Sequence, residues 1–131
     1  MKNILILFTL IVLPTSVLFS QTNDSSTIED YKIEIVGTWV HENDSLTKIV
    51  FSNDNKIRHY EGAQLRLIEH YEITRTCDGE TIAANKGYFL KTYSDKHGEF
   101  CAYIEGLNYE NNGFFSLMTK NQGKIVVYIK Q

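Results

Sequence analysis

The fold is decided by residues 36–62, which read VGTWVHENDSLTKIVFSNDNKIRHYEG. This stretch contains short runs rich in Val, Ile, Thr, Tyr and Trp. Each run is followed by a turn signal, and the three signals are Asn43-Asp44, Asn53-Asp54-Asn55 and Glu61-Gly62. β-Branched and aromatic residues favour extended strands, whereas Asn, Asp and Gly favour tight turns. The stretch therefore predicts three consecutive strands joined by hairpins.

The same pattern continues to the end of the chain. Four further turn signals follow: Cys77-Asp78-Gly79, Ser94-Asp95 to Gly98, Asn111-Asn112-Gly113 and Asn121-Gln122-Gly123. Turn signals thus separate eight extended segments, and no segment after residue 35 keeps a helical period for three turns. Eight sequential antiparallel strands most simply close into an all-β, up-and-down barrel over residues 35–131, because closure removes exposed edges. A two-sheet sandwich is the main alternative, and a five-stranded oligonucleotide-binding barrel is a third.

Two strand positions carry specific expectations. Cys101 alternates with Phe100, Ala102 and Ile104, so we expect its side chain to leave their face and to reach a loop outside the core. Glu69 lies on the apolar side of its strand. The interpretation we favour is a bulge that shifts the register at Glu69, and the alternative is an acid that points into the interior.

The N-terminal residues resemble an export signal. A lysine at position 2 precedes Ile4 to Leu13, a nearly unbroken apolar run of ten residues, and the small Ser20 precedes Gln21. A transmembrane anchor needs about 20 apolar residues. We therefore predict a signal peptide over residues 1–20, an exported protein that is periplasmic or secreted, and no stable membrane insertion after the signal is removed.

The next residues, 21–34, form a polar leader. Ser26 and Glu29 have the spacing of a capping box, which predicts one short helical turn before the barrel.

Composition limits the kinds of partner. The chain has 131 residues, of which 43% are hydrophobic and 22% are charged, and its formal net charge is −3. These values are typical of one globular domain. A net negative charge argues against nucleic acid as a partner, since nucleic acid requires a basic surface.

The chain has two cysteines, Cys77 and Cys101. In an exported protein such a pair usually oxidises, so we expect a disulfide, with two unpaired thiols as the alternative. A loop of about 25 residues closed in this way would stabilise the fold by about 3.5 kcal/mol in the chain-entropy model.

Gly37-Thr38-Trp39, which open the first strand, resemble the Gly-x-Trp signature of lipocalins. The chain is similar to the small bacterial lipocalin-like domains, which are exported barrels of this length. The resemblance implies structural roles for Gly37 and Trp39, with the Trp packed across the closed end beneath an Arg from near the last strand. No Arg follows Arg75, and Lys124 or Lys130 is expected to be a poor substitute for a planar stacking cation.

The resemblance also implies that the protein binds a small apolar or amphipathic ligand inside the barrel. The candidate cavity-lining residues are Tyr60, Tyr71, Tyr88, Tyr103 and Phe115. The same aromatics are equally expected as half-exposed strand residues. Eight strands in about 97 residues make a short barrel with a small or filled cavity. The second hypothesis is therefore an envelope or secreted interaction module, such as an inhibitor or assembly partner, with a filled barrel and a protein partner that the sequence does not identify.

Catalytic motifs are sparse. The four histidines show neither His-x-His nor His-Glu-x-x-His spacing, and the chain has no Gly-x-Ser-x-Gly elbow and no phosphate-binding Gly-rich loop. We accordingly predict a protein that is not an enzyme, with no catalytic residue, no metal and no cofactor.

Overall fold

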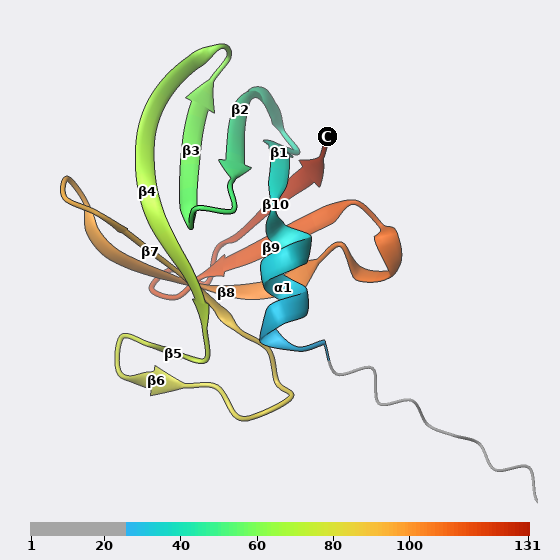
Figure 1. Cartoon of the computed structure of the whole chain (residues 1–131), viewed down its shortest axis with the longest axis vertical. Helices are drawn as coiled ribbons and strands as arrows, with labels where there is room; N and C mark the ends of the chain where they lie inside the picture. The colour runs from blue at the N-terminus through green and yellow to red at the C-terminus, as the bar shows by residue number, and fades with distance from the viewer. Residues whose placement is uncertain (1–25) are drawn as a thin grey trace, which may run out of the picture.

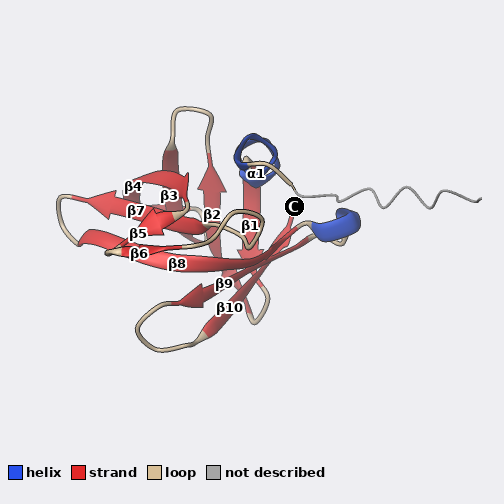
Figure 2. Ribbon diagram, turned by 90° about the horizontal axis from the view of Figure 1, so that it is seen from below, coloured by secondary structure: helices blue, strands red, loops and turns tan. Residues whose placement is uncertain are grey.

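A computed structural model describes residues 26–131 of the chain. The signal peptide predicted for residues 1–20 and the start of the leader lie outside the described residues. Eight antiparallel strands close into a barrel in the order β1-β10-β9-β8-β7-β4-β3-β2 (Figures 1 and 2). The barrel strands are β1 (Gly37–His41), β2 (Asp44–Phe51), β3 (Lys56–Glu61), β4 (Gln64–Thr74), β7 (Phe89–Ser94), β8 (Gly98–Leu107), β9 (Phe114–Thr119) and β10 (Ile125–Lys130).

Each predicted turn lies in a connection between these strands or overlaps the strand ends beside it, so the predicted eight-stranded antiparallel barrel is confirmed and the sandwich and five-stranded alternatives are wrong. The connection between β4 and β7 is the long one. It contains a two-stranded hairpin outside the barrel, β5 (Thr76–Cys77) and β6 (Glu80–Thr81). The β8–β9 connection holds the short 3-10 helix η1 (Tyr109–Asn111).

One end of the barrel is covered by helix α1 (Ile28–Ile35), which packs against β4 and β8. Its N-terminus is a capping box made by Thr27 and Asp30, one residue later than the predicted pair Ser26 and Glu29. The helix therefore extends the predicted single turn to eight residues. No helix among the described residues has the length and apolarity needed to cross a bilayer.

The opposite end is the mouth, where the hairpins after β1, β3, β7 and β9 lie. The core fills the half of the barrel next to α1. Trp39, Phe51 and Phe115 are each 1% exposed or less, and the Phe115 ring lies 5.4 Å from the Trp39 ring and 5.8 Å from the Phe51 ring, measured between centroids. Aromatic side chains therefore fill the α1 end of the barrel, and other residues line the half of the barrel nearer the mouth.

Cross-strand pairs settle which way Glu69 points. Residues directly opposite each other on paired strands share a face. Glu69 is opposite Ile57, a core residue, and is itself 8% exposed. The register of β3 and β4 does shift, but it does so nearer the mouth, between the His59–Leu67 and Tyr60–Leu65 pairs. The predicted bulge at Glu69 is wrong, and the acid points into the barrel.

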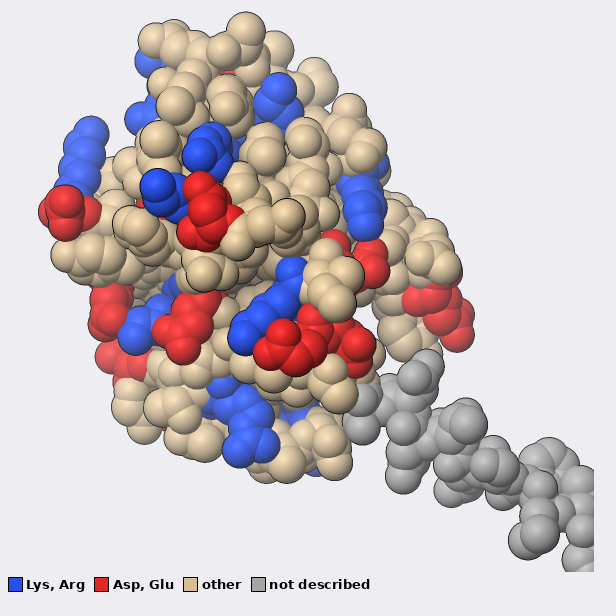
Figure 3. All heavy atoms as spheres, viewed as in Figure 1, with Lys and Arg blue, Asp and Glu red and all other residues tan. Residues whose placement is uncertain are grey.

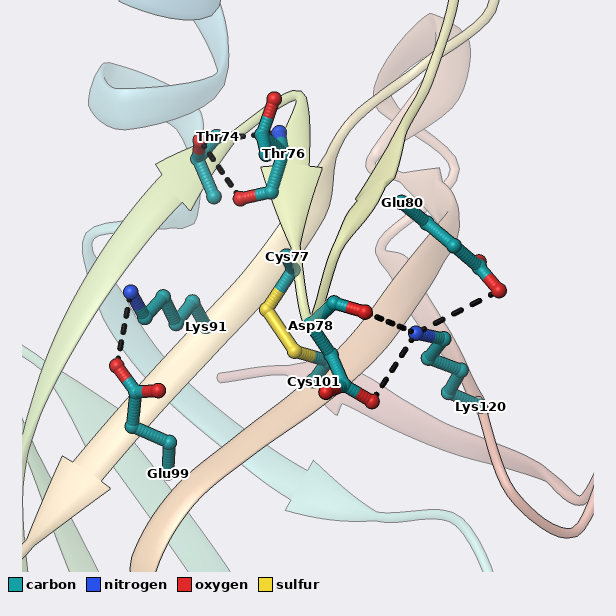
Figure 4. The surroundings of a disulfide bond; sticks show 9 residues. All are labelled: Thr74, Thr76, Cys77, Asp78, Glu80, Lys91, Glu99, Cys101 and Lys120. Atoms are coloured by element: carbon teal, nitrogen blue, oxygen red, sulfur yellow. Dashed lines mark hydrogen bonds and ion pairs between the residues drawn. A yellow bond between two sulfur atoms is a disulfide. The ribbon is translucent and has the colours of Figure 1, made fainter.

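The structure joins Cys77 to Cys101, with the two Cα atoms 6.1 Å apart (Figure 4). The Cys101 side chain points away from the inner face of β8, as its alternation with Ala102 and Ile104 predicts. Its disulfide holds the β5–β6 hairpin against the outside of the barrel. Lys120 from the end of β9 fixes the same hairpin. Its Nζ atom lies 3.1 Å from Asp78 Oδ2 and 3.5 Å from Glu80 Oε1. The hairpin is thus tied to the wall at two points.

Candidate functional site

The closed end of the barrel is built around Trp39. Its indole Nε1–H donates a hydrogen bond of 2.8 Å to the Ile35 carbonyl, so the end of α1 and the first strand are joined inside the core. The ammonium of Lys130 lies 5.4 Å from the centroid of the Trp39 ring. Of the two lysines considered, Lys130 therefore lies where the lipocalin resemblance places an Arg, and it offers a compact ammonium in place of a planar guanidinium.

Lys130 is held in place by Glu34 of α1. The Lys130 Nζ atom donates to Glu34 Oε1 at 2.9 Å, and the Asn108 side-chain amide donates to the same oxygen. These two hydrogen bonds, aided by the charge of Lys130, hold the pKa of Glu34 below its ordinary value. The helix, the β8–β9 connection and the last strand are therefore fastened together at this end.

The mouth half differs from the core in chemistry. Thr92 is opposite Tyr71, and Phe100 is opposite Thr92, so all three face inward. Thr92 and Ser94 are buried polar residues, whereas Phe100 is 47% exposed at the rim. The inner wall near the mouth thus combines hydroxyl groups with apolar side chains that solvent reaches.

Glu69 and His59 form the most polar part of this inner wall. His59 Nε2 and Glu69 Oε2 lie 2.7 Å apart. The Glu69 side chain is 10% exposed and that of His59 is 34% exposed, so the pair runs from the buried wall toward the mouth. An ionised carboxylate taken out of water without a partner costs several kcal/mol, which the imidazole donor offsets. The pair places a carboxylate and an imidazole side by side on the inner wall of the barrel.

The five aromatics predicted to line a cavity separate into three groups. Tyr71 and Phe115 lie inside, in the core; the Tyr71 hydroxyl donates to the Ser52 carbonyl, and burial raises the pKa of Tyr71. Tyr60 faces outward beneath the Lys48 ammonium, and Tyr103 faces outward.

The remaining aromatic, Tyr88, packs against Tyr31 of α1 with ring centroids 4.8 Å apart. On the outer face, the Tyr103 hydroxyl donates to the Lys86 carbonyl at 2.7 Å. The structure does not bring the five aromatics together around one cavity.

Sequence reasoning missed His59 and Thr92 as inner-wall residues. Their positions depend on the pairing register of β3 with β4 and of β4 with β7, which a single strand does not reveal. The sequence did carry one indication of this inner wall: Glu69, Tyr71 and Ile73 are spaced two residues apart, so their side chains lie on the same face of β4.

Several hollows of the described surface lie outside the barrel, around α1. One of about 350 Å³ lies between the helix and the end of β8, and its lining includes Asp30, Glu34, Glu105 and Glu110. Another of about 500 Å³ lies between the helix and the end of β4. On the face drawn in Figure 3, Lys and Arg are interspersed with Asp and Glu. Among residues 26–131 no group of three or more His, Cys, Asp or Glu is placed to hold a metal ion.

No protein-family model, curated protein or solved structure matches the chain. The closed eight-stranded antiparallel barrel is consistent with a lipocalin-like fold, which the resemblance of Gly37-Thr38-Trp39 to the Gly-x-Trp signature implies.

Proposed function

We propose that this protein is an exported lipocalin-like binding module that holds a small amphipathic ligand in the mouth half of its barrel. The observation that carries the proposal is the inward-facing Glu69 with its partner His59. Apolar residues of the same volume commonly stabilise a protein interior at least as well as a polar pair, so packing alone does not account for Glu69 and His59 on the inner wall. Recognition of a polar group of a ligand does account for the presence of Glu69 and His59.

The surroundings of Glu69 define the ligand class. The carboxylate accepts hydrogen bonds, which favours a donor group such as an ammonium or a hydroxyl. Phe100 at the rim and the half-buried Leu67 and Leu117 offer apolar contact for a short tail. The tail is short because Trp39 and its aromatic neighbours already fill the α1 end.

Export is supported by the disulfide between Cys77 and Cys101, since such bonds persist in oxidising compartments. The compartment, periplasmic or extracellular, is part of the proposal.

A filled-barrel interaction module is the second candidate. It is favoured by the β5–β6 hairpin, which the disulfide and Lys120 hold rigidly on the outer wall. Rigid surface elements lose little conformational entropy on binding a protein partner.

The experiment compares two probes with the same short tail, hexylamine and hexanoic acid, by titration calorimetry with protein purified from its own host. We expect the amine to bind, and Glu69→Gln to weaken it at least about 10-fold, which is about 1.4 kcal/mol. Glu72→Gln is the matched control, because Glu72 lies on the same strand but is exposed and faces outward.

Equal binding of the amine by wild type and Glu69→Gln would refute the assignment of the polar group. Binding of neither probe, together with native mass spectra free of any added lipid-sized mass, would exclude the ligand role and leave the interaction module.

A further inference from the structure

Helix α1 separates two surface hollows of opposite charge. The hollow between the helix and the end of β8 is lined by four carboxylates, Asp30, Glu34, Glu105 and Glu110. The hollow of about 500 Å³ between the helix and the end of β4 has two cations in its lining, Lys32 and Arg75, and one acid, Glu72. We refer to the second as the basic hollow. Its positive charge is local, since the whole chain has a formal net charge of −3.

The base of the basic hollow is apolar. Ile73 of β4 is 2% exposed, and Ile28 of α1 and Tyr88 of the β4–β7 connection are half-buried beside it. The Tyr88 ring packs on Tyr31, and its hydroxyl donates to the Ser26 carbonyl. A volume of about 500 Å³ lies within the range of small-molecule sites. The hollow therefore offers room and apolar surface for an aromatic ring.

Arg75 is the arginine that has no internal partner. The other two arginines, Arg58 and Arg66, each pair with a carboxylate, at 3.6 Å and 2.8 Å. Within residues 26–131 no carboxylate pairs with Arg75, which is exposed where it lines the hollow. The parallel N–H groups of a guanidinium match the two oxygens of a carboxylate. Arg75 is thus available to an anion that enters the hollow.

Lys32 supplies a second cation. Its Nζ atom lies 3.0 Å from Glu29 Oε1, but the two side chains are 47% and 71% exposed. Exposed ion pairs of this kind contribute little to stability, so an anion in the hollow can share the ammonium. Glu72 lies opposite Lys91 of β7, which offsets the charge of this acid. The hollow therefore keeps a net positive charge.

We propose that the basic hollow is a second binding site, separate from the barrel mouth, for a small carboxylate that carries an aromatic ring. The carboxylate pairs with Arg75 beside Lys32, and the ring packs on Tyr88. Two cations and one acid leave one net positive charge in the lining, which a single carboxylate neutralises and a phosphate dianion exceeds. The acidic hollow on the other side of α1 repels the same ligand.

An NMR titration of the ¹⁵N-labelled, disulfide-bonded protein with phenylacetate at pH 7 tests the proposal. We expect the amide signals of Ile28, Ile73 and Tyr88 to shift together, with a Kd of about 1 mM because the site is open to water. Phenylacetamide has nearly the same shape and no charge, and it should bind at least about 10-fold more weakly.

Charge-removing variants locate the anion. Arg75→Gln should weaken phenylacetate binding at least about 10-fold, and Lys32→Gln about 3-fold. Arg66→Gln is the matched control, because it removes the same charge from an exposed arginine of β4 outside the hollow. It should bind phenylacetate as the wild type does. Glu69→Gln should also leave binding unchanged, which keeps this test independent of the barrel mouth.

Three results would overturn the proposal. The first is an absence of shifts up to about 20 mM phenylacetate, which is about 20 times the expected Kd. The second is equal binding of phenylacetamide, or shifted amides that lie at the mouth and not beside α1. The third is equal weakening by Arg75→Gln and Arg66→Gln, which would reflect net charge alone. Lys32→Gln repeats the test at the second cation should Arg75→Gln fail to fold.

Discussion

Replacing Trp39 by Ala should remove a large part of the stability of the domain. The side chain is fully buried, and truncating a buried aromatic to Ala costs about 3–5 kcal/mol. The Ile35 carbonyl also loses its indole donor, which adds about 1–2 kcal/mol because a buried acceptor is left unpaired. The expected loss is about 4–7 kcal/mol, against a total of about 5–15 kcal/mol for a domain of this size.

Trp39→Phe separates the two contributions. Phe keeps a ring against Phe115 and loses the N–H donor and part of the volume, so about 1.5–3 kcal/mol should be lost. The assay is urea unfolding followed by far-UV circular dichroism, since the chain has one Trp and the variants lack its fluorescence. A loss below about 1 kcal/mol for Trp39→Ala would refute the role of Trp39 as the centre of the closed end.

Two further predictions concern the covalent and ionic ties of the barrel. The double variant Cys77→Ser, Cys101→Ser should lower the free energy of unfolding by about 3.5 kcal/mol, read as a lower urea midpoint; uptake of two alkyl groups by unreduced wild type would contradict the disulfide. Glu34→Gln should cost under about 1 kcal/mol at neutral pH, because the pair with Lys130 is partly exposed. The Glu34 pKa is lowered in the folded state, so its contribution is present above the unfolded value of 4.5 and disappears as the pH falls through the folded pKa. A stability difference between Glu34→Gln and wild type that is unchanged from pH 7 to pH 3 would contradict this linkage.

The strand order followed from local sequence because each turn is encoded by adjacent residues. Asn55 and Asp78, for example, adopt the left-handed backbone conformation that turn residues tolerate. Cys101 could be placed as well, because alternation along one strand decides which side chains share a face.

The facing of the aromatics could not be predicted in the same way. Between residues 88 and 93, apolar side chains occur at both odd and even positions, so alternation does not identify the inner face. Phe89 faces outward, yet it is 5% exposed because the β4–β7 connection and Tyr103 cover it. In β10 the aliphatic Ile125 and Ile129 face out while Tyr128 faces the core, the reverse of what hydrophobicity alone favours.

The polar part of the mouth escaped prediction for a related reason. Burying a glutamate without a partner is costly, so the sequence alone favours a register shift at Glu69 over an acid that points inward. His59, ten residues away in sequence, supplies the partner, and only the pairing of β3 with β4 brings the two together.

The barrel is sealed by its first and last strands, with Trp39 opposite Lys130. Lys130 also bonds to Glu34, 96 residues earlier in the chain. Contacts of such long range raise the contact order and slow folding, because loop-closure entropy must be overcome before they form. The barrel therefore cannot close until β10 is free to pair with β1. A truncation that removes β10 leaves β1 and β9 with unpaired edges, which are prone to aggregation.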